Sequence, residues 1–391
     1  MVERTLGYMG YFDRESCDLD EFKVLTSQSL NAEQAPHAMA VEKNIPIYDM
    51  SALGTELDDP AQRRALMAEW GHVLAASSGV IVLKAAYAET ADIDRASEIF
   101  AQIIEAERDA GAGKGDHFAA SGANDRIWNS LQKQCLSDPE NFLRYFANPA
   151  IATACEAWLG PHYQMTAQVN QVRPGGKAQN AHRDYHLGFQ KAEIAACFPA
   201  HAHEVTATLT LQGAIAHVDM PLESGPTKLL PFSQLYGPGY LAFHDPAFAA
   251  YFEQACVQLP LAKGDAVFFN PALFHAAGEN RSADIDRMVN LLQVSSAFGR
   301  AMEAVDRDAM CRAAYPALKA IAGELSDWEL SAAIGALAAG YSFPTNLDTD
   351  PPIGGNAPVT QADMLWQALD ESWNETQLHA QLDALNARQT A

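Results

Sequence analysis

Apolar side chains recur at helical spacing in two stretches near the start of the chain. The first stretch follows Asp59-Pro60, an N-cap residue with proline at the first helical position, and contains Leu66, Met67, Trp70, Val73 and Leu74. The second contains Ile93, Ala96, Ile99, Phe100, Ile103 and Ile104. An apolar, β-branched run at 80–83 lies between them and predicts a short strand. The first 58 residues show no clear period, and we expect them to form an N-terminal extension packed on the main body.

The pattern changes to short strand-like runs in the middle of the chain and returns to helical spacing near its end. Runs at 163–172, 205–218, 266–269 and 288–294 are separated by Pro, Gly and Asn turns, which is typical of an antiparallel sandwich or barrel. After residue 300, Ser326 with Glu329 and Thr360 with Asp363 have the spacing of helix N-caps. We therefore expect a β domain over 59–300 and a helical elaboration over 301–391. These helices would pack on the β body or on a second subunit, which would make the protein an oligomer.

Composition narrows the class of protein. The 391 residues include 26 basic and 49 acidic side chains, a formal net charge of 26 − 49 = −23, which repels nucleic acid at long range. No stretch approaches the roughly 18 apolar residues of a membrane helix, and acids interrupt the first residues where a signal peptide would be apolar. The six cysteines lie far apart without a CxxC pair, so we expect reduced thiols. The sequence predicts a cytoplasmic protein that binds neither nucleic acid nor membranes.

The most informative segment for chemistry is His182-Arg-Asp184. Residues i and i+2 of a strand point to the same face, so this imidazole and carboxylate would lie side by side. They provide two thirds of a 2-His-1-carboxylate triad, a donor set that binds Fe(II) and leaves adjacent positions open. His275, at the end of an apolar strand, is the candidate third ligand. The alternative is structural: a histidine hydrogen-bonded to a nearby aspartate, and a core strand that ends in a satisfied histidine.

Arg287 opens the next strand, twelve residues after His275. It shares one face of that strand with Val289, Leu291 and Gln293. A lone arginine on an apolar inward face costs free energy unless it pairs with an anion, and its planar guanidinium suits a carboxylate. The alternatives are that Arg287 extends to water at the strand end, or that Arg281 takes the anion-binding role.

These residues and three further segments resemble the phytanoyl-CoA dioxygenase-like family of Fe(II)/2-oxoglutarate oxygenases. The segments are 223–234 (ESGPTKLLPFSQ), 263–265 (KGD) and 275–282 (HAAGENRS), and the likeness runs from about 70 to 298. The resemblance implies an α+β fold with a mainly β core, a double-stranded β-helix (jelly roll, cupin-like) with flanking N- and C-terminal helices. It also implies Fe(II), 2-oxoglutarate and O2 as cofactor and co-substrates. By position, His182, Asp184 and His275 would hold iron, Arg287 would bind the distal carboxylate of 2-oxoglutarate, and Asn170 would contact the co-substrate.

The same resemblance implies hydroxylation of an unactivated C–H bond of a small metabolite, with release of succinate and CO2. Because Asp184 is retained, hydroxylation is favoured over halogenation. One departure concerns Ala277, where many relatives carry a hydroxyl side chain. Two other classes stay open: a cupin-like metal-dependent isomerase or hydrolase that does not use 2-oxoglutarate, and a non-catalytic scaffold protein.

Residues near the HxD segment indicate the class of substrate. The basic residues there are Arg173, Lys177, Arg183 and Lys191. They support the hypothesis of a small substrate with a carboxylate or similar anion, the alternative being ordinary solvated loop charge. The predicted pocket residues are Gln168, Arg183, Tyr185, His186 and Phe189. His186 also completes an HxDxH string like that of some zinc hydrolases, but the sequence lacks the further clusters that those enzymes need.

Overall fold

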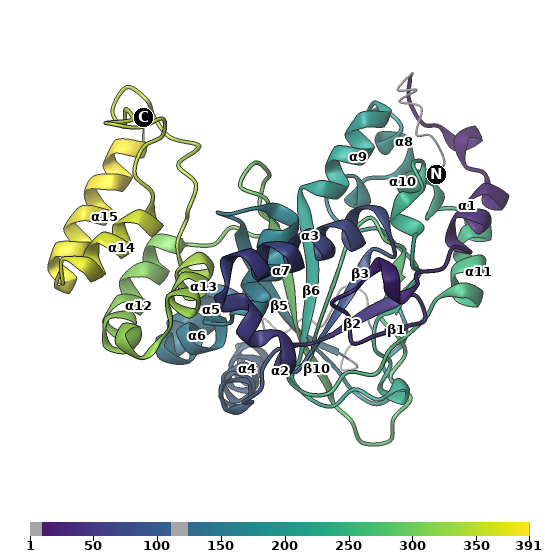
Figure 1. The fold of residues 1–391 in the computed structure, drawn as a ribbon, viewed down its shortest axis with the longest axis horizontal. Coiled ribbons are helices and arrows are strands. Elements are labelled where there is room, and N and C mark those ends of the chain that lie inside the picture. The colour runs from purple at the N-terminus through teal and green to yellow at the C-terminus, as the bar shows by residue number, and fades with distance from the viewer. Residues whose placement is uncertain (1–9, 111–123, 391) are drawn as a thin grey trace.

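The computed structural model describes residues 10–110 and 124–390, and an eight-stranded sheet forms its centre (Figure 1). The strand order is β1-β2-β3-β8-β6-β10-β5-β4, and all neighbours are antiparallel except β2 and β3. The strands are β1 (Ala40–Glu42), β2 (Ile45–Asp49), β3 (Val80–Lys84), β4 (Asn124–Ile127), β5 (Gln164–Val172), β6 (Thr210–Ala216), β8 (Ala266–Phe269) and β10 (Arg287–Ser295).

A smaller sheet faces this main sheet. It consists of β7 (Lys228–Leu229) and β9 (His275–Ala276), and isolated bridges extend it: His182 pairs with His275, and Leu229 pairs with Val257. Buried apolar residues from both sheets form one cluster between them, including Val82, Val267 and Leu229. Two sheets closed over a common apolar layer form the jelly roll, so the predicted fold class is confirmed.

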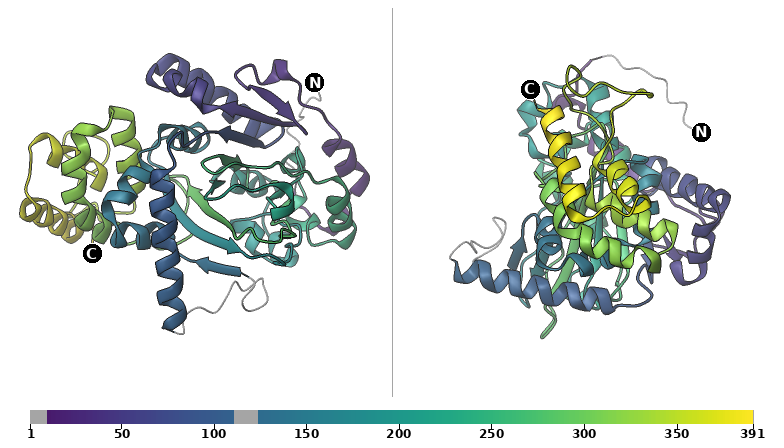
Figure 2. Two further views of the ribbon diagram at one scale, coloured as in Figure 1. Left: turned by 90° about the horizontal axis from the view of Figure 1, so that it is seen from below. Right: turned by 90° about the vertical axis from the view of Figure 1, so that its left-hand side faces the viewer.

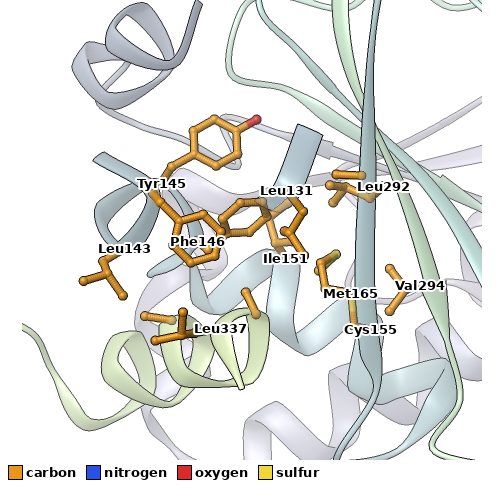
Figure 3. Close-up of a cluster of buried hydrophobic side chains, with 14 of the residues drawn as sticks. Leu131, Leu143, Tyr145, Phe146, Ile151, Cys155, Met165, Leu292, Val294 and Leu337 are labelled. Carbon is orange, nitrogen blue, oxygen red and sulfur yellow. The ribbon is translucent and has the colours of Figure 1, made fainter. Parts of the chain in front are cut away.

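Helices cover the opposite face of the main sheet. Side chains alternate along each central strand, so Met165 and Val169 of β5 point to the helices, whereas Gln168 and Asn170 point between the sheets. Figure 3 shows Met165, Leu292 and Val294 of the sheet packed against Ile151 and Phe146 of the covering helices. The α-helices that precede β5 in the described part of the chain are α1 (Leu19–Thr26), α2 (Met50–Leu53), α3 (Pro60–Ala76), α4 (Ala91–Asp109), α5 (Ser130–Ser137), α6 (Pro139–Phe146) and α7 (Pro149–Leu159).

The last four helices gather at one end of the molecule, as Figure 1 and the left view of Figure 2 show. The first two of them, at 307–321 and 327–337, contact α5, α6, α7 and β5 of the same chain, and the last two pack on these two helices. The caps predicted at Ser326 and Thr360 are present, and each forms a capping box with the third residue of its helix. The helices of the second half of the chain are α8 (Ala192–Ala195), α9 (Ala200–Thr208), α10 (Gly239–Ala242), α11 (Pro246–Ala255), α12 (Arg307–Ile321), α13 (Asp327–Leu337), α14 (Gln361–Asp370) and α15 (Glu375–Gln389). No helix in the described ranges is long and apolar enough to cross a lipid bilayer.

Two sequence predictions about secondary structure need correction. The strand predicted at 205–218 begins only at Thr210, because 205–208 are the last turn of α9, an alanine-rich helix that starts after Pro199. The first 58 residues also contribute more than a covering segment, because β2 pairs with β3 and joins β1 to the edge of the main sheet. The sequence around β2 is short and apolar on both faces, which leaves no period to detect.

Candidate metal centre

The backbone brings the three candidate ligands together. His182 and His275 form an isolated antiparallel bridge, in which the N–H of His182 donates to the carbonyl of His275 (3.0 Å) and the N–H of His275 donates back (3.2 Å). The N–H of Asp184 donates to the carbonyl of Pro271 at 3.0 Å, which fixes the second residue of the HxD segment on the same strand-like track. Two segments more than ninety residues apart in sequence are thereby held side by side.

The two imidazoles present the same nitrogen to the centre. Nδ1 of His182 lies 2.8 Å from the carbonyl of Asn180, and Nδ1 of His275 lies 2.9 Å from the carbonyl of Leu273. A carbonyl only accepts, so each Nδ1 carries the proton and each Nε2 keeps its lone pair. Nε2 of His182 lies 3.6 Å from Oδ1 of Asp184, and Nε2 of His275 lies 3.3 Å from Oδ2.

This geometry fits a single octahedral cation. One donor atom from each of the three residues lies within 4.8 Å of the others. Neighbouring ligands on an octahedral ion with bonds of about 2.1 Å stand about 3 Å apart, close to the 3.6 Å and 3.3 Å between the imidazole nitrogens and the oxygens of Asp184. Two imidazole nitrogens and one carboxylate on one side are the donor set that suits non-haem Fe(II).

The ionisation states also fit metal ligation. Burial alone would raise the pKa of Asp184, but the neighbouring imidazoles of His182 and His275 and a hydrogen bond from Gln212 hold it well below its usual range. Burial lowers the pKa of His182. An ionised carboxylate beside a neutral imidazole is the form in which both residues bind a cation.

Arg287 lies in the same cavity as a buried cation without an acidic partner. Its side chain is 4% exposed, and Nη1 donates to the carbonyls of Ser224 (3.0 Å) and Gly278 (3.1 Å). Burial lowers its pKa to about 10, and no described carboxylate pairs with it. The neighbouring Asn170 has a buried Oδ1 without a hydrogen-bond partner. Arg281, the other candidate, is exposed and does not line the cavity, which leaves Arg287 as the anion-binding candidate.

The cavity has a volume of about 650 Å³ and is open to solvent. One wall comes from the inward faces of β5, β6 and β10. Along each of these strands, side chains that line the cavity alternate with side chains that face the helices. The lining includes His182, Asp184, His275, Arg287, Asn170, Gln168, Gln212, Gln293, Arg126, Trp128, Phe189 and Met302. A volume of this size accommodates a keto acid together with a second small molecule.

Most of the basic residues near the HxD segment, predicted to form the mouth of the pocket, are engaged with other groups of the protein. Arg183 contributes to the cavity wall, but its guanidinium donates to the carbonyls of Ser233 (2.6 Å) and Tyr236 (3.0 Å) and stacks on Tyr240. It points away from the face of its neighbours His182 and Asp184, because side chains alternate along the segment. The guanidinium of Arg183 fits in this position because residue 239 is glycine: it occupies the space that a Cβ there would need.

The other basic residues of this group do not create a positive mouth either. Lys177 pairs with Glu279, and Arg173 pairs with Asp125, while Lys191 is exposed. The hypothesis of an anionic substrate loses the residues on which it depended.

Tyr185 and His186 do not line the cavity, contrary to expectation. Both have positive φ, 63° and 45°, and this turn carries the chain behind the wall before Phe189 returns to it. Tyr185 is buried and its ring packs against Phe189 at 5.9 Å, so it supports the wall from behind.

Sequence reasoning missed Gln212, Arg126, Trp128 and Met302 as wall residues and did not assign Gln293 to the pocket. A signal was available for Gln293 and Gln212, since each is a polar residue at an inward position of a largely apolar strand. The predicted start of the strand at 205 obscured the alternation around Gln212.

Comparisons with known proteins agree with this geometry. Residues 63–289, more than half of the chain, match the family model of phytanoyl-CoA dioxygenase (PhyH). The chain is 29% identical over 139 residues to "Dioxygenase trt7" of Aspergillus terreus, covering 36% of this chain and 43% of that protein. It is 31% identical over 129 residues to "Dioxygenase cdmD" of Talaromyces verruculosus, covering 33% and 38%. The chain thus spans less than half the length of these curated relatives.

Solved structures that this chain matches include the carbocyclase SnoK from nogalamycin biosynthesis, described as non-heme and alpha ketoglutarate dependent. That match has a TM-score of 0.46 and 20% identity, and covers 64% of this chain and 92% of SnoK. The epimerase SnoN, in complex with Fe3+, alpha-ketoglutarate and nogalamycin RO, matches with a TM-score of 0.40 and 19% identity over 61% and 85% of the two chains.

Proposed function

Because this chain belongs to the phytanoyl-CoA dioxygenase (PhyH) family, we propose that it is an Fe(II)- and 2-oxoglutarate-dependent oxygenase. The reaction we propose is hydroxylation of a C–H bond in a small-molecule substrate, with conversion of 2-oxoglutarate and O2 to succinate and CO2. The single observation that carries the proposal is the convergence of His182, Asp184 and His275, each with a donor atom open toward one point.

His182, Asp184 and His275 would hold the iron, which supplies the oxygen chemistry when it is bound. The contribution of the chain is positioning. The carbonyls of Asn180 and Leu273 keep the Nδ1 protons of the two histidines in place, so that both Nε2 atoms stay available. Asp184 is an intact carboxylate, so the position that a halogenating relative leaves open for chloride is filled here, which favours hydroxylation.

Arg287 would bind the distal carboxylate of 2-oxoglutarate. Its guanidinium is already desolvated and is held by two carbonyls, so a carboxylate that pairs with it gains a charge-assisted, bidentate contact at little further ordering cost. Asn170, the register partner of Val289 on the adjacent strand, would donate an amide N–H to the same co-substrate. Ala277 offers no hydroxyl to help, so Arg287 carries this contact without the hydroxyl that many relatives have.

A succinate-release assay tests the proposal. The purified chain is incubated with Fe(II), 2-oxoglutarate and O2, with and without a panel of candidate small molecules, and succinate is quantified. We expect succinate formation that requires both iron and 2-oxoglutarate and that rises with a competent substrate. Turnover of a substrate at a rate independent of 2-oxoglutarate would contradict the proposal and would favour a cupin-like isomerase or hydrolase.

A further inference from the structure

A row of hydrogen-bonding side chains crosses the inner face of the main sheet. Arg126 of β4 donates from Nη1 to Oε1 of Gln168 on β5 at 3.0 Å. Nε2 of Gln168 donates to Oε1 of Gln293 on β10 at 2.9 Å. On the next strand, β6, Nε2 of Gln212 donates to Oδ2 of Asp184. The row thus runs across four neighbouring strands and ends at the candidate iron ligand.

The two ends of the row determine how each amide is oriented. A guanidinium only donates, so Gln168 must turn its oxygen to Arg126 and its nitrogen to Gln293. Gln293 then accepts with its oxygen, and its Nε2 is left as a free donor. At the other end an ionised carboxylate only accepts, so Gln212 must turn its nitrogen to Asp184. Its Oε1 is left as a free acceptor.

These two free atoms face the same gap. Gln293 and Gln212 are direct partners in the register of β10 and β6, so their side chains leave the sheet next to one another on the cavity face. Oε1 of Gln212 is buried and has no partner, and no described residue accepts from Nε2 of Gln293. Leaving a buried acceptor unpaired is unfavourable, so a group that donates to Oε1 of Gln212 and accepts from Nε2 of Gln293 is bound favourably.

We propose that this gap is the substrate-recognition subsite, and that it takes a neutral group that both accepts and donates a hydrogen bond, namely a hydroxyl or a carboxamide. This inference rests on the proposed function, because the gap adjoins Asp184. A hydroxyl oxygen accepts from Nε2 of Gln293 while its hydrogen bonds to Oε1 of Gln212. A carboxylate has no hydrogen for Gln212, and an ammonium group has no lone pair for Gln293.

The surroundings of the gap indicate the rest of the molecule. Leu291 lies two positions before Gln293 on the same face of β10, and Trp128 and Phe189 line the outer part of the cavity. Apart from Arg287, the cations of this region are engaged with protein groups: Arg126 with Gln168, and Arg183 with backbone carbonyls. The substrate class is therefore an uncharged molecule with an apolar frame and at least one hydroxyl or carboxamide.

Five probes with one frame test the subsite: cyclohexylmethanol, cyclohexanecarboxamide, cyclohexanecarboxylate, cyclohexylmethylamine and methylcyclohexane. Their affinities are measured by titration calorimetry on the full chain loaded with Fe(II) and 2-oxoglutarate without oxygen, so that no turnover is needed. We expect the alcohol and the carboxamide to bind at least about tenfold more tightly than the other three. Equal affinities, no binding of the alcohol and the carboxamide, or tighter binding of the carboxylate would overturn the subsite.

A variant pair makes the test specific to the gap. Gln293→Glu keeps the oxygen that accepts from Gln168 but replaces the free donor with an acceptor, so the preference should move from the alcohol to the amine. Gln293→Met has a similar size and no polar atom, and should lose the preference for the alcohol without gaining one for the amine. An unchanged order of affinities in Gln293→Glu would also overturn the subsite. Loading the chain with 2-oxoglutarate is itself followed by calorimetry, which separates the two ideas. Absent binding of 2-oxoglutarate contradicts the proposed function, whereas the order of probe affinities tests the gap.

Discussion

Histidines occur on both sides of the main sheet, and they differ in what their nitrogens contact. On the helix side, His217 has both ring nitrogens bonded: Nδ1 lies 2.8 Å from Oγ of Ser97, and Nε2 lies 2.9 Å from the hydroxyl of Tyr145. On the cavity side, His182 and His275 each bond a backbone carbonyl through Nδ1 only and turn Nε2 toward Asp184.

Asparagines show the same contrast. Asn290 points to the helices and bonds the hydroxyl of Tyr145 with its nitrogen, whereas Asn170 points into the cavity with a bare Oδ1. Burial alone therefore does not separate structural polar residues from functional ones in this protein. Groups that are satisfied by the fold stabilise it, and groups that the fold leaves open are available to a ligand.

Replacing one histidine on each side of the sheet should give the largest difference in activity and in stability. His275→Ala removes an open metal-binding nitrogen and is expected to lower oxygenase activity by about a thousandfold or more, while the free energy of unfolding without metal falls by less than in His217→Ala. His217→Ala removes two satisfied hydrogen bonds in a packed core and should cost about 2–4 kcal/mol of stability. Chemical denaturation and succinate release, measured on both variants, check that one variant loses mainly activity and the other mainly stability. A stability loss in His275→Ala as large as that in His217→Ala would contradict it.

The next effect concerns the buried cation of the cavity. Arg287→Met should raise the KM for 2-oxoglutarate about a hundredfold, because the distal carboxylate loses a charge-assisted pair worth roughly 2–3 kcal/mol. Arg281→Met is the matched control, since Arg281 is exposed and outside the cavity. Equal KM values for the two variants would exclude Arg287 as the anion-binding residue.

A smaller effect is expected for hydrogen bonds on the helix side. Tyr145→Phe deprives His217 and Asn290 of their shared partner and should lower the free energy of unfolding by about 1–3 kcal/mol without changing the KM for 2-oxoglutarate. On the cavity side, Asn170→Leu has no bond of Oδ1 to lose and should cost less than about 0.5 kcal/mol, while it raises that KM. Denaturant titrations and steady-state kinetics check both variants. A larger stability loss in Asn170→Leu than in Tyr145→Phe, or a raised KM only in Tyr145→Phe, would contradict the contrast between the two sides of the sheet.

The last effect is a pH dependence of stability. Burial, with a minor contribution from Lys263 opposed by Asp94, lowers the pKa of His217 to about 3, whereas an unfolded histidine titrates near 6.5. Between these values the unfolded chain binds a proton that the folded chain does not, so stability falls as the pH falls, by at most about 1.4 kcal/mol per pH unit. His217→Gln should flatten the curve relative to the native chain in denaturant titrations from pH 7 to pH 4. Parallel curves would contradict the assignment.

Local signals explain how much of this structure the sequence predicts. The capping residues Asp59, Ser326 and Thr360 mark helix starts that the structure confirms, because a cap depends only on neighbouring residues. The alternation of β10 correctly predicts that Arg287 and Gln293 share a face that is turned to the cavity. The spacing of His182 and Asp184 likewise predicts that these two residues lie together, as they do.

Long-range packing explains what the sequence could not predict. Alternation shows that Arg183 points away from His182, but not that carbonyls fifty residues later, at Ser233 and Tyr236, would receive its guanidinium. The open atoms of Gln212 and Gln293 depend on the register between two strands separated by about eighty residues. A single sequence contains no signal for that register.

The most direct test of the account is an anaerobic titration of the full chain with Fe(II) in the presence of 2-oxoglutarate, followed by visible absorption. We predict a metal-to-ligand charge-transfer band that saturates at one iron per chain and that is absent in His275→Ala. No band in the native chain, or a band of equal intensity in His275→Ala, would contradict the claim that these three open side chains hold the iron.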